Sequence, residues 1–155
     1  MAARPYVAVV GGSQPSPVEL ATAEAVGHGL GEAGAVVVCG GRAGVMEAVC
    51  RGAHRAGGLT VGLLPGLDRA EANDWVAVAI PTGLGELRNG LVVRAADAVI
   101  AVGGSYGTLS EVALALRAGT PVFGLGTWAI EGIEPLSTPP EAVERALAVA
   151  ARRHR

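Results

Sequence analysis

Short, valine-rich apolar runs alternate with longer amphipathic stretches along most of the chain. Residues 6–10 (YVAVV) and 35–39 (AVVVC) are almost wholly apolar, which is typical of strands covered on both faces of a parallel sheet. Between them, Ser16-Pro17-Val18-Glu19 predicts a helix start, with Pro17 at the first helical position and Glu19 completing a capping box with Ser16. Strands that alternate with helices predict βαβ units, parallel strands and right-handed crossovers.

The same alternation extends to the C-terminus. It predicts a Rossmann-like α/β fold, a doubly wound parallel sheet in three α/β/α layers, with one nucleotide-binding domain over residues 1–155 and no second domain. Residues 65–74 are expected to form a loop, and residues 126–139 a mobile stretch. The expected strands are 6–10, 35–39, 60–64, 75–80, 98–102 and 121–125, and the expected helices are 17–31, 45–56, 84–95, 108–118 and 140–151.

The composition narrows the functional class. A chain of 155 residues with 50% hydrophobic and 17% charged residues is expected to bury its own core rather than to be disordered. The net charge is −2 and the longest basic block is Arg152-Arg153, so a nucleic-acid partner is not expected. The apolar runs are too short for a membrane span or a signal-peptide core, so we expect a cytoplasmic protein without a membrane partner, in which Cys39 and Cys50 are buried thiols.

All 12 basic residues are arginine, and the chain has no lysine. A pyridoxal-phosphate lysine decarboxylase is thereby excluded, because its cofactor is held as a Schiff base with a lysine. A Walker A phosphate loop is excluded for the same reason. A GC-rich genome would also produce this composition.

Glycine-rich loops follow three of the predicted strands, and each precedes a predicted helix. They are Gly11-Gly12-Ser13, Gly40 to Gly44, and Gly103 to Gly107. In an open parallel sheet, ligands bind beyond the carboxyl ends of the strands, where helix N-termini offer free N–H groups. Three such loops favour a phosphate-bearing ligand; the alternative is that tight strand-to-helix turns need glycine in any case.

Two other kinds of site are not expected. The dinucleotide fingerprint G-x-G-x-x-G is absent after the first strand, and Cys39-Gly40-Gly41 stands where a ribose-binding acid would be, which argues against a dehydrogenase. The three histidines, His28, His54 and His154, are scattered, so no metal site is predicted.

The segment Gly103-Gly104-Ser105-Tyr106-Gly107-Thr108-Leu109-Ser110-Glu111 resembles the P-G-G-x-G-T-x-x-E motif of the Lonely Guy family, cytokinin-activating phosphoribohydrolases often mislabelled lysine decarboxylases. Gly107, Thr108 and Glu111 match, whereas Gly103 and Ser105 replace the proline and the second glycine of the motif. The turn from Gly40 to Met46 resembles the G-G-x-x-G-(V/L)-M turn of the family, and Arg88 lies at the family's spacing upstream of the loop, with Arg94 and Asp97 fitting the intervening pattern.

Other positions depart from that family. Glu86-Leu87-Arg88-Asn89 replaces M-H-x-R-K, so the histidine and the lysine are missing. The Arg-Asn pair with G-G-x-x-G-T-L-S-E is more similar to a sister branch of bacterial proteins, which resembles the molybdenum-cofactor carriers that bind a phosphorylated pterin. The resemblance implies a nucleotide-like ligand and leaves three functions open: a phosphoribohydrolase acting on nucleoside 5′-monophosphates, a non-catalytic carrier of molybdenum cofactor, or a nucleotide sensor. No cofactor is required for the first; molybdenum cofactor is the implied ligand of the second.

Arg88 and Glu111 are the candidate catalytic residues. Glu111 would stabilise an oxocarbenium-like sugar or activate water, and Arg88 would hold the phosphate or orient Glu111. The alternatives are that Thr108 and Glu111 form a capping box, and that Arg88 is a solvated surface charge. Trp75 and Trp128 are expected to be packing residues rather than ligand contacts.

The other candidate site residues would bind the phosphate or nucleotide. We expect a side chain at Gly107 to block the ligand or to strain the turn. We also expect a homodimer or a homotetramer, through helices such as 84–95 and 111–118. The binding candidates are Gly11, Gly12, Ser13, Gly40, Gly41, Gly44, Met46, Asn89, Gly103, Gly104, Ser105, Tyr106, Gly107 and Thr108.

Overall fold

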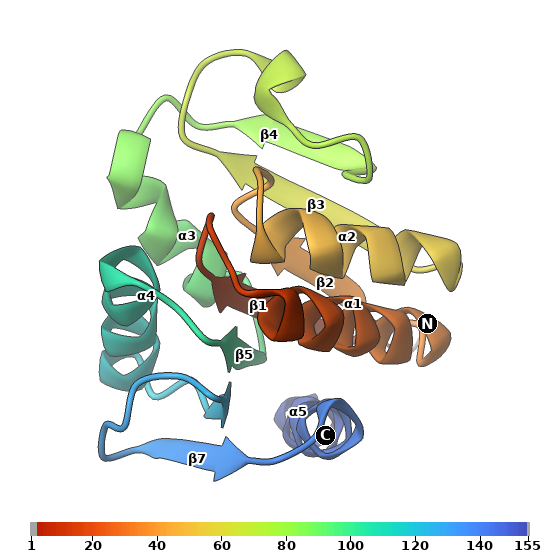
Figure 1. Cartoon of the computed structure of the whole chain (residues 1–155), viewed down its shortest axis with the longest axis vertical. Helices are drawn as coiled ribbons and strands as arrows, with labels where there is room; N and C mark the ends of the chain where they lie inside the picture. The colour runs from red at the N-terminus through yellow and green to blue at the C-terminus, as the bar shows by residue number, and fades with distance from the viewer. Residues whose placement is uncertain (1–2, 155) are drawn as a thin grey trace.

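A seven-stranded sheet, parallel throughout, runs through the computed structural model, which describes residues 3–154 (Figure 1). The strand order is β4-β3-β2-β1-β5-β6-β7. The predicted Rossmann-like α/β class and the parallel sheet are therefore confirmed. The elements are β1 (Tyr6–Gly11), α1 (Pro17–Glu32), β2 (Val36–Cys39), α2 (Val45–Arg55), β3 (Leu59–Leu64), β4 (Val78–Pro81), α3 (Arg88–Arg94), β5 (Ala98–Val102), α4 (Tyr106–Arg117), β6 (Val122–Leu125), β7 (Ile133–Leu136) and α5 (Pro139–Arg153), with short 3-10 helices at Arg69–Glu71 and Gly85–Leu87.

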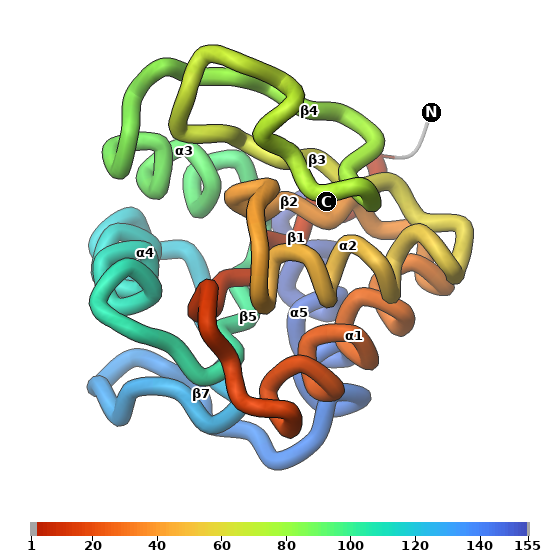
Figure 2. The backbone as a smooth tube through the Cα atoms, turned by 45° about the horizontal axis from the view of Figure 1, so that its top comes forward, coloured from red at the N-terminus to blue at the C-terminus, as the bar shows by residue number. Residues whose placement is uncertain are grey.

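Helices cover both faces of the sheet. Helices α1, α2 and α5 lie on one side and α3 and α4 on the other, as both ribbon views show (Figures 1 and 2). Alternate residues of the central strands enter the two cores: Val7 and Val9 face α1, α2 and α5, whereas Ala8 and Val10 face α3 and α4. This two-sided burial explains why the strands read as unbroken apolar runs. No helix within residues 3–154 has the length and apolar character needed to cross a membrane.

The chain reverses its direction of winding between β1 and β5. From β1 it proceeds outward through β2 and β3 to β4, then returns through α3 to β5 on the other side of β1. In doubly wound sheets this switch point opens a crevice beyond the carboxyl ends of the two strands, where ligands bind. The loops that follow β1 and β5 are two of the three glycine-rich loops.

Two expectations about the elements were wrong. Residues 126–139 are not a loop throughout, because β7 forms at Ile133–Leu136 and extends the sheet beyond β6. The predicted helix over residues 84–95 is divided into a 3-10 turn and the shorter helix α3, which begins at Arg88. Both edge strands contain a proline, Pro81 in β4 and Pro135 in β7, and proline is tolerated there because an edge strand does not need every N–H group for pairing.

Helices α1 and α2 pack unusually closely through glycine. A Cβ atom added at Gly27 would overlap the carbonyl oxygen of Val49, and one added at Gly52 would overlap that of Glu24. Arg51 and Arg55 of α2 then both reach the carboxylate of Glu24, at 3.3 and 2.9 Å. Helices α1 and α2, which follow the first two glycine loops, are thus held together by backbone-to-backbone contact.

We expect Gly52→Ala to lower the free energy of unfolding by about 1–3 kcal/mol, because α1 and α2 must separate to admit the methyl group. Gly90→Ala in α3 is the matched control: its Cβ would meet nothing closer than 3.9 Å, and replacing a helical glycine should stabilise by about 0.5–1 kcal/mol. Urea unfolding of both variants measures the difference. Equal stabilities for the two variants would contradict the close packing.

Candidate functional site

The three glycine-rich loops lie side by side, because they follow the adjacent strands β2, β1 and β5. The loops after β1 and β2 are in direct contact: the N–H of Val45 donates to the carbonyl of Gly12 at 3.0 Å. Gly44 has a positive φ of 74°, and a side chain there would collide with Gly12 and Ser13. The sequence therefore predicted correctly that the loops meet at one edge of the sheet.

The turn between β5 and α4 depends on Gly103 and Gly104, which have φ angles of 55° and 123°. Helix α4 begins at Tyr106, with Ser105 in the N-cap position, so Glu111 lies well inside the helix. The alternative interpretation of Thr108 and Glu111 as a capping box is therefore wrong.

Gly107 also differs from expectation. Its φ is not positive and a Cβ there would meet nothing within 4 Å, so a side chain would not strain the turn. The strained position is Gly104, where a Cβ would lie 2.5 Å from the Cβ of Thr108. Gly107 instead leaves open space at the first turn of α4, and whether a ligand uses that space stays a prediction.

Arg88, the first residue of α3, lies against the glycine loop after β2. A Cβ atom at Gly40 would lie 2.6 Å from Arg88 Nη2 and 2.7 Å from Met46 Sδ. Only glycine at position 40 leaves room for the guanidinium to cross the end of β2. Arg88 is half-buried, not the solvated surface charge that was the alternative interpretation.

A hydrogen bond to Asn89 fixes the guanidinium of Arg88. Arg88 Nη1 donates to Asn89 Oδ1, Asn89 Nδ2 donates to Ser110 Oγ at 3.2 Å, and Ser110 Oγ donates to the carbonyl of Gly107 at 2.7 Å. This chain of bonds joins α3 to the first turn of α4. Asn89 is only 7% exposed and uses both ends of its amide within the protein, which suits a positioning residue better than the expected ligand contact.

Glu111 is a buried carboxyl group, only 8% exposed. Burial raises its pKa to about 7, and the attraction of Arg88 only partly offsets that rise. The charges of Glu111 and Arg88 both act on Cys39. The hydrogen bond with Cys50, whose sulfur lies 3.5 Å away, lowers the pKa of Cys39, while Glu111 raises it and Arg88 lowers it. Both cysteines are buried free thiols, as the sequence predicted.

Two buried polar atoms near this edge, Arg88 Nε and Thr108 Oγ1, have no hydrogen-bond partner among residues 3–154. Thr108 is only 1% exposed and lies under Gly104 in the turn that opens α4. Unpartnered buried donors are costly, and a ligand that accepts hydrogen bonds would remove that cost. These two groups lie near the free N–H groups at the start of α4, where helix N-termini commonly bind anions.

Three further candidates lie exposed at the rim, whereas Gly41 is buried. Ser13 and Ser105 are exposed, and Tyr106 is 81% exposed. Two residues that were not candidates are bonded to the β5–α4 turn: Thr127 Oγ1 donates to the carbonyl of Gly103 at 2.6 Å, and Trp128 Nε1 donates to that of Ser105 at 3.2 Å. No local pattern marked them, because they belong to the segment after β6.

Such a parallel sheet, with glycine loops, an arginine and a buried carboxyl group at its switch point, defines a Rossmann-like protein. The chain belongs to the SLOG cluster4 family, to which residues 4–151 match. The resemblance drawn from the β5–α4 motif and from Arg88-Asn89 is thereby confirmed at the level of the superfamily.

The chain is similar to solved structures of molybdenum-cofactor proteins. The molybdenum cofactor binding protein of Rippkaea orientalis is 36% identical, with a TM-score of 0.90 over 95% of this chain and 98% of that one. The molybdenum cofactor carrier protein of Chlamydomonas reinhardtii is 31% identical, with a TM-score of 0.89 over 97% and 99%. A protein of Archaeoglobus fulgidus is 41% identical over 138 residues, which cover 88% of this chain and 91% of that protein.

The raised pKa of Glu111 predicts how stability depends on pH. Between about pH 4.5 and 7 the folded carboxyl keeps its proton while the unfolded one loses it, so stability falls as pH rises through this window. The loss should reach about 3 kcal/mol. Glu111→Gln should remove this fall, which urea unfolding from pH 4 to 8 would measure. If wild type and variant had parallel pH profiles, Glu111 would not be the buried titrating group.

Proposed function

We propose that this protein is a non-catalytic carrier that binds a phosphorylated pterin cofactor of the molybdenum-cofactor type at the carboxyl edge of its sheet. The cofactor is cargo here and takes part in no reaction. Its phosphate would lie at the first turn of α4, in the open space beside Gly107, and would accept hydrogen bonds from backbone N–H groups and from Thr108. Arg88 would supply the positive charge.

One observation carries this proposal: Arg88 Nε and Thr108 Oγ1 are both buried at the candidate site without a partner. A phosphate or another oxyanion offers several acceptor oxygens to such donors. The molybdenum cofactor binding protein of Rippkaea orientalis and the carrier protein of Chlamydomonas reinhardtii support the choice of cofactor, since this chain is similar to both over nearly its full length. The missing histidine and lysine beside Arg88 favour a carrier over a hydrolase.

A second candidate, a phosphoribohydrolase, is favoured by Glu111. A buried carboxyl group with a pKa of about 7 is suited to general acid–base work near neutral pH. Beside the anomeric carbon of a nucleoside 5′-monophosphate it would stabilise an oxocarbenium-like sugar or activate water, and the products would be the free base and ribose 5-phosphate. The binding site would be the same.

Ligand binding and base release separate the two candidates. The ligands are a panel of nucleoside 5′-monophosphates and isolated molybdenum cofactor, and the proteins are wild type, Arg88→Gln, Gly107→Val and Glu111→Gln. Calorimetry measures the affinity, and chromatography detects free base. We expect Arg88→Gln to weaken binding of phosphorylated ligands about 10- to 100-fold, because a charged hydrogen-bond donor is lost. Gly107→Val should prevent binding without unfolding the protein, because its side chain fills the open space.

Arg117→Gln, on the exposed last turn of α4, is the control and should bind as wild type does. A carrier releases no base from any nucleotide. A hydrolase releases base, and Glu111→Gln then lowers turnover by about 100-fold or more while binding persists. Unchanged affinity in both Arg88→Gln and Gly107→Val would remove this edge of the sheet from the binding site.

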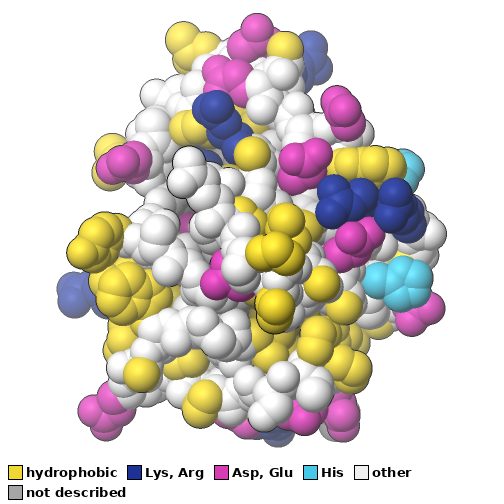
Figure 3. Space-filling model, in the orientation of Figure 1, with side chains coloured by type: hydrophobic (Ala, Val, Ile, Leu, Met, Phe, Trp, Pro, Cys, Tyr) yellow, Lys and Arg dark blue, Asp and Glu magenta, His cyan; other side chains and the backbone are white. Residues whose placement is uncertain are grey.

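The flank formed by α3 and α4 suggests an assembly with a second copy of the chain. Leu84, Leu87, Leu91 and Leu114 are between 42% and 77% exposed on these two helices and their approach. Figure 3 shows hydrophobic side chains gathered over α4 at the left of the view. Apolar groups clustered on one flank are typical of a protein interface. We infer at least a dimer through this flank.

Light scattering at micromolar concentration tests the assembly. Wild type should have at least twice the mass of the chain, and the double variant Leu87→Asp/Leu91→Asp should be a monomer. Val18→Asp is the control, since Val18 is 74% exposed on α1, on the opposite face of the sheet from this flank, and should leave the mass unchanged. A wild-type monomer would contradict the inference.

A further inference from the structure

The connection between β6 and β7 is unusual for a parallel pair. Parallel neighbours are normally joined by a crossover of a dozen or more residues, most often a helix. Here residues 126–132, which we call the β6–β7 connection, join the two strands without a helix. Thr127 and Trp128 occupy the start of the connection.

Three contacts join the β6–β7 connection to the β5–α4 turn. Thr127 and Trp128 donate to the carbonyls of Gly103 and Ser105 as described above, and the ring of Trp128 lies 5.9 Å from that of Tyr106, centre to centre. The hydrogen bond from Nε1 fixes the orientation of the indole. Because that N–H group is already satisfied, the indole has only its flat apolar faces to offer a ligand.

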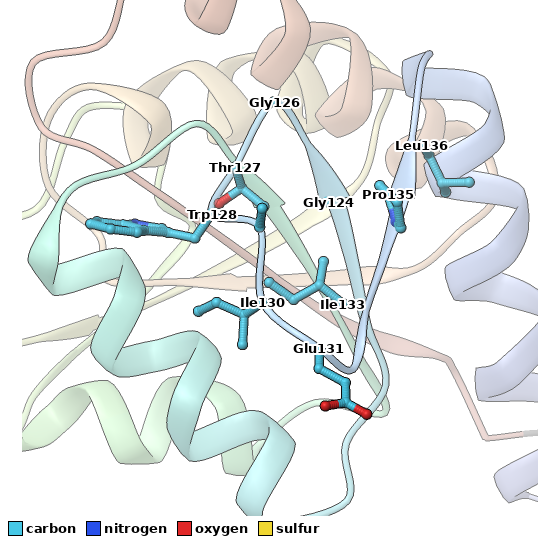
Figure 4. Close-up of a pocket in the computed structure, with 10 residues that line it drawn as sticks. Gly124, Gly126, Thr127, Trp128, Ile130, Glu131, Ile133, Pro135 and Leu136 are labelled. Carbon is cyan, nitrogen blue, oxygen red and sulfur yellow. The ribbon is translucent and has the colours of Figure 1, made fainter.

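Trp128 also lines a hollow of about 360 Å³ (Figure 4). Ile130, Ile133 and Leu136 make its walls largely apolar. The indole lies at one end of the hollow and extends from the connection toward the start of α4, away from Ile133 and Leu136. A hollow of this size and character suits the ring of a small ligand, since binding sites are concave and mostly apolar with a few polar groups. Glu131 is the charged residue that lines the hollow, and it lies further along the connection than Thr127 and Trp128.

We propose that Trp128 is a stacking platform for the planar heterocycle of a ligand whose phosphate is bound at the β5–α4 turn. The proposal rests on the proposed function, because the phosphate site fixes one end of the ligand. The ligand class is a phosphorylated compound with a flat aromatic ring, a pterin or a nucleobase. Tyr106, exposed at the start of α4, lies next to the platform and adds a second aromatic ring to it.

The chain contains two tryptophans, which allows a direct optical test. Trp75→Phe leaves Trp128 as the single indole and keeps an aromatic ring against His54 and Arg55. In this background, adenosine 5′-monophosphate, guanosine 5′-monophosphate and a monophosphorylated pterin should quench the fluorescence. Ribose 5-phosphate, which has the phosphate without the ring, should bind without quenching. Guanosine, which has the ring without the phosphate, should quench only at higher concentration.

Two substitutions separate stacking from support of the turn. Trp128→Leu removes the ring and should weaken binding of the ring-bearing phosphates about tenfold, whereas Trp128→Phe keeps a ring, lacks the N–H group, and should bind nearly as wild type does. Both variants should bind ribose 5-phosphate with unchanged affinity. That last measurement shows that the phosphate turn has not moved.

Each other outcome is decisive. Two results would overturn the stacking platform and leave Trp128 as a support of the turn. One is that Trp128→Leu binds nucleotides and pterins as tightly as wild type does. The other is that both variants lose affinity for ribose 5-phosphate to the same extent. If ribose 5-phosphate does not bind but guanosine still quenches in a manner that Trp128→Leu abolishes, the platform stands and the proposed phosphate site fails. If none of the probes binds, both proposals fail.

Discussion

Parallel pairing of β1 with both β2 and β5 is the constraint on which the site depends. In the register of the sheet, Val7 pairs with Val37 on one side and with Ala98 on the other, so the three strands end near one another. Each strand then has to turn into a helix at that end, and the three turns share one short edge. Glycine makes this crowding possible, as at Gly40, where any side chain would displace Arg88 and Met46.

The electrostatics of the site follow from its burial. Arg88 and Glu111 come from α3 and α4, and their helices meet on one side of the sheet, joined by the bonds of Asn89 and Ser110. Desolvation outweighs the attraction between the two charged groups, so Glu111 titrates near neutrality rather than staying ionised. Below about pH 7, where the carboxyl group keeps its proton, the guanidinium stays available to an anionic ligand. That condition is useful to a carrier and to a hydrolase alike, which is why geometry alone does not rank the two.

The residues around Arg88 favour the proposed carrier over the hydrolase. A hydrolase must place an acid, a base and a cation with respect to one scissile bond, whereas a carrier must only make binding favourable. Here Glu86-Leu87 precede Arg88 and Asn89 follows it, and Asn89 is occupied in positioning the arginine. The site keeps the features needed for binding: glycine turns, a cation and unpartnered hydrogen-bond donors. The relatives in Rippkaea orientalis and Chlamydomonas reinhardtii are a molybdenum cofactor binding protein and a molybdenum cofactor carrier protein.

Local signals in the sequence, valine-rich runs and glycine turns, predicted the fold class and the three glycine loops, and Arg88 and Glu111 were recognised as candidates from their motifs. It predicted the capping box of Ser16 and Glu19, which the structure contains, and wrongly offered another at Thr108 and Glu111, since the spacing is the same and only the start of α4 distinguishes them. The tertiary structure alone decided the strand β7, the orientation of Asn89 and the contact of Trp128 with the turn after β5. The bonds of Asn89 to Ser110 and of Trp128 to Ser105 join residues at least 21 positions apart, and no local pattern records which distant neighbour a side chain will meet. Strand β7 forms only because β6 offers it a parallel edge to pair with.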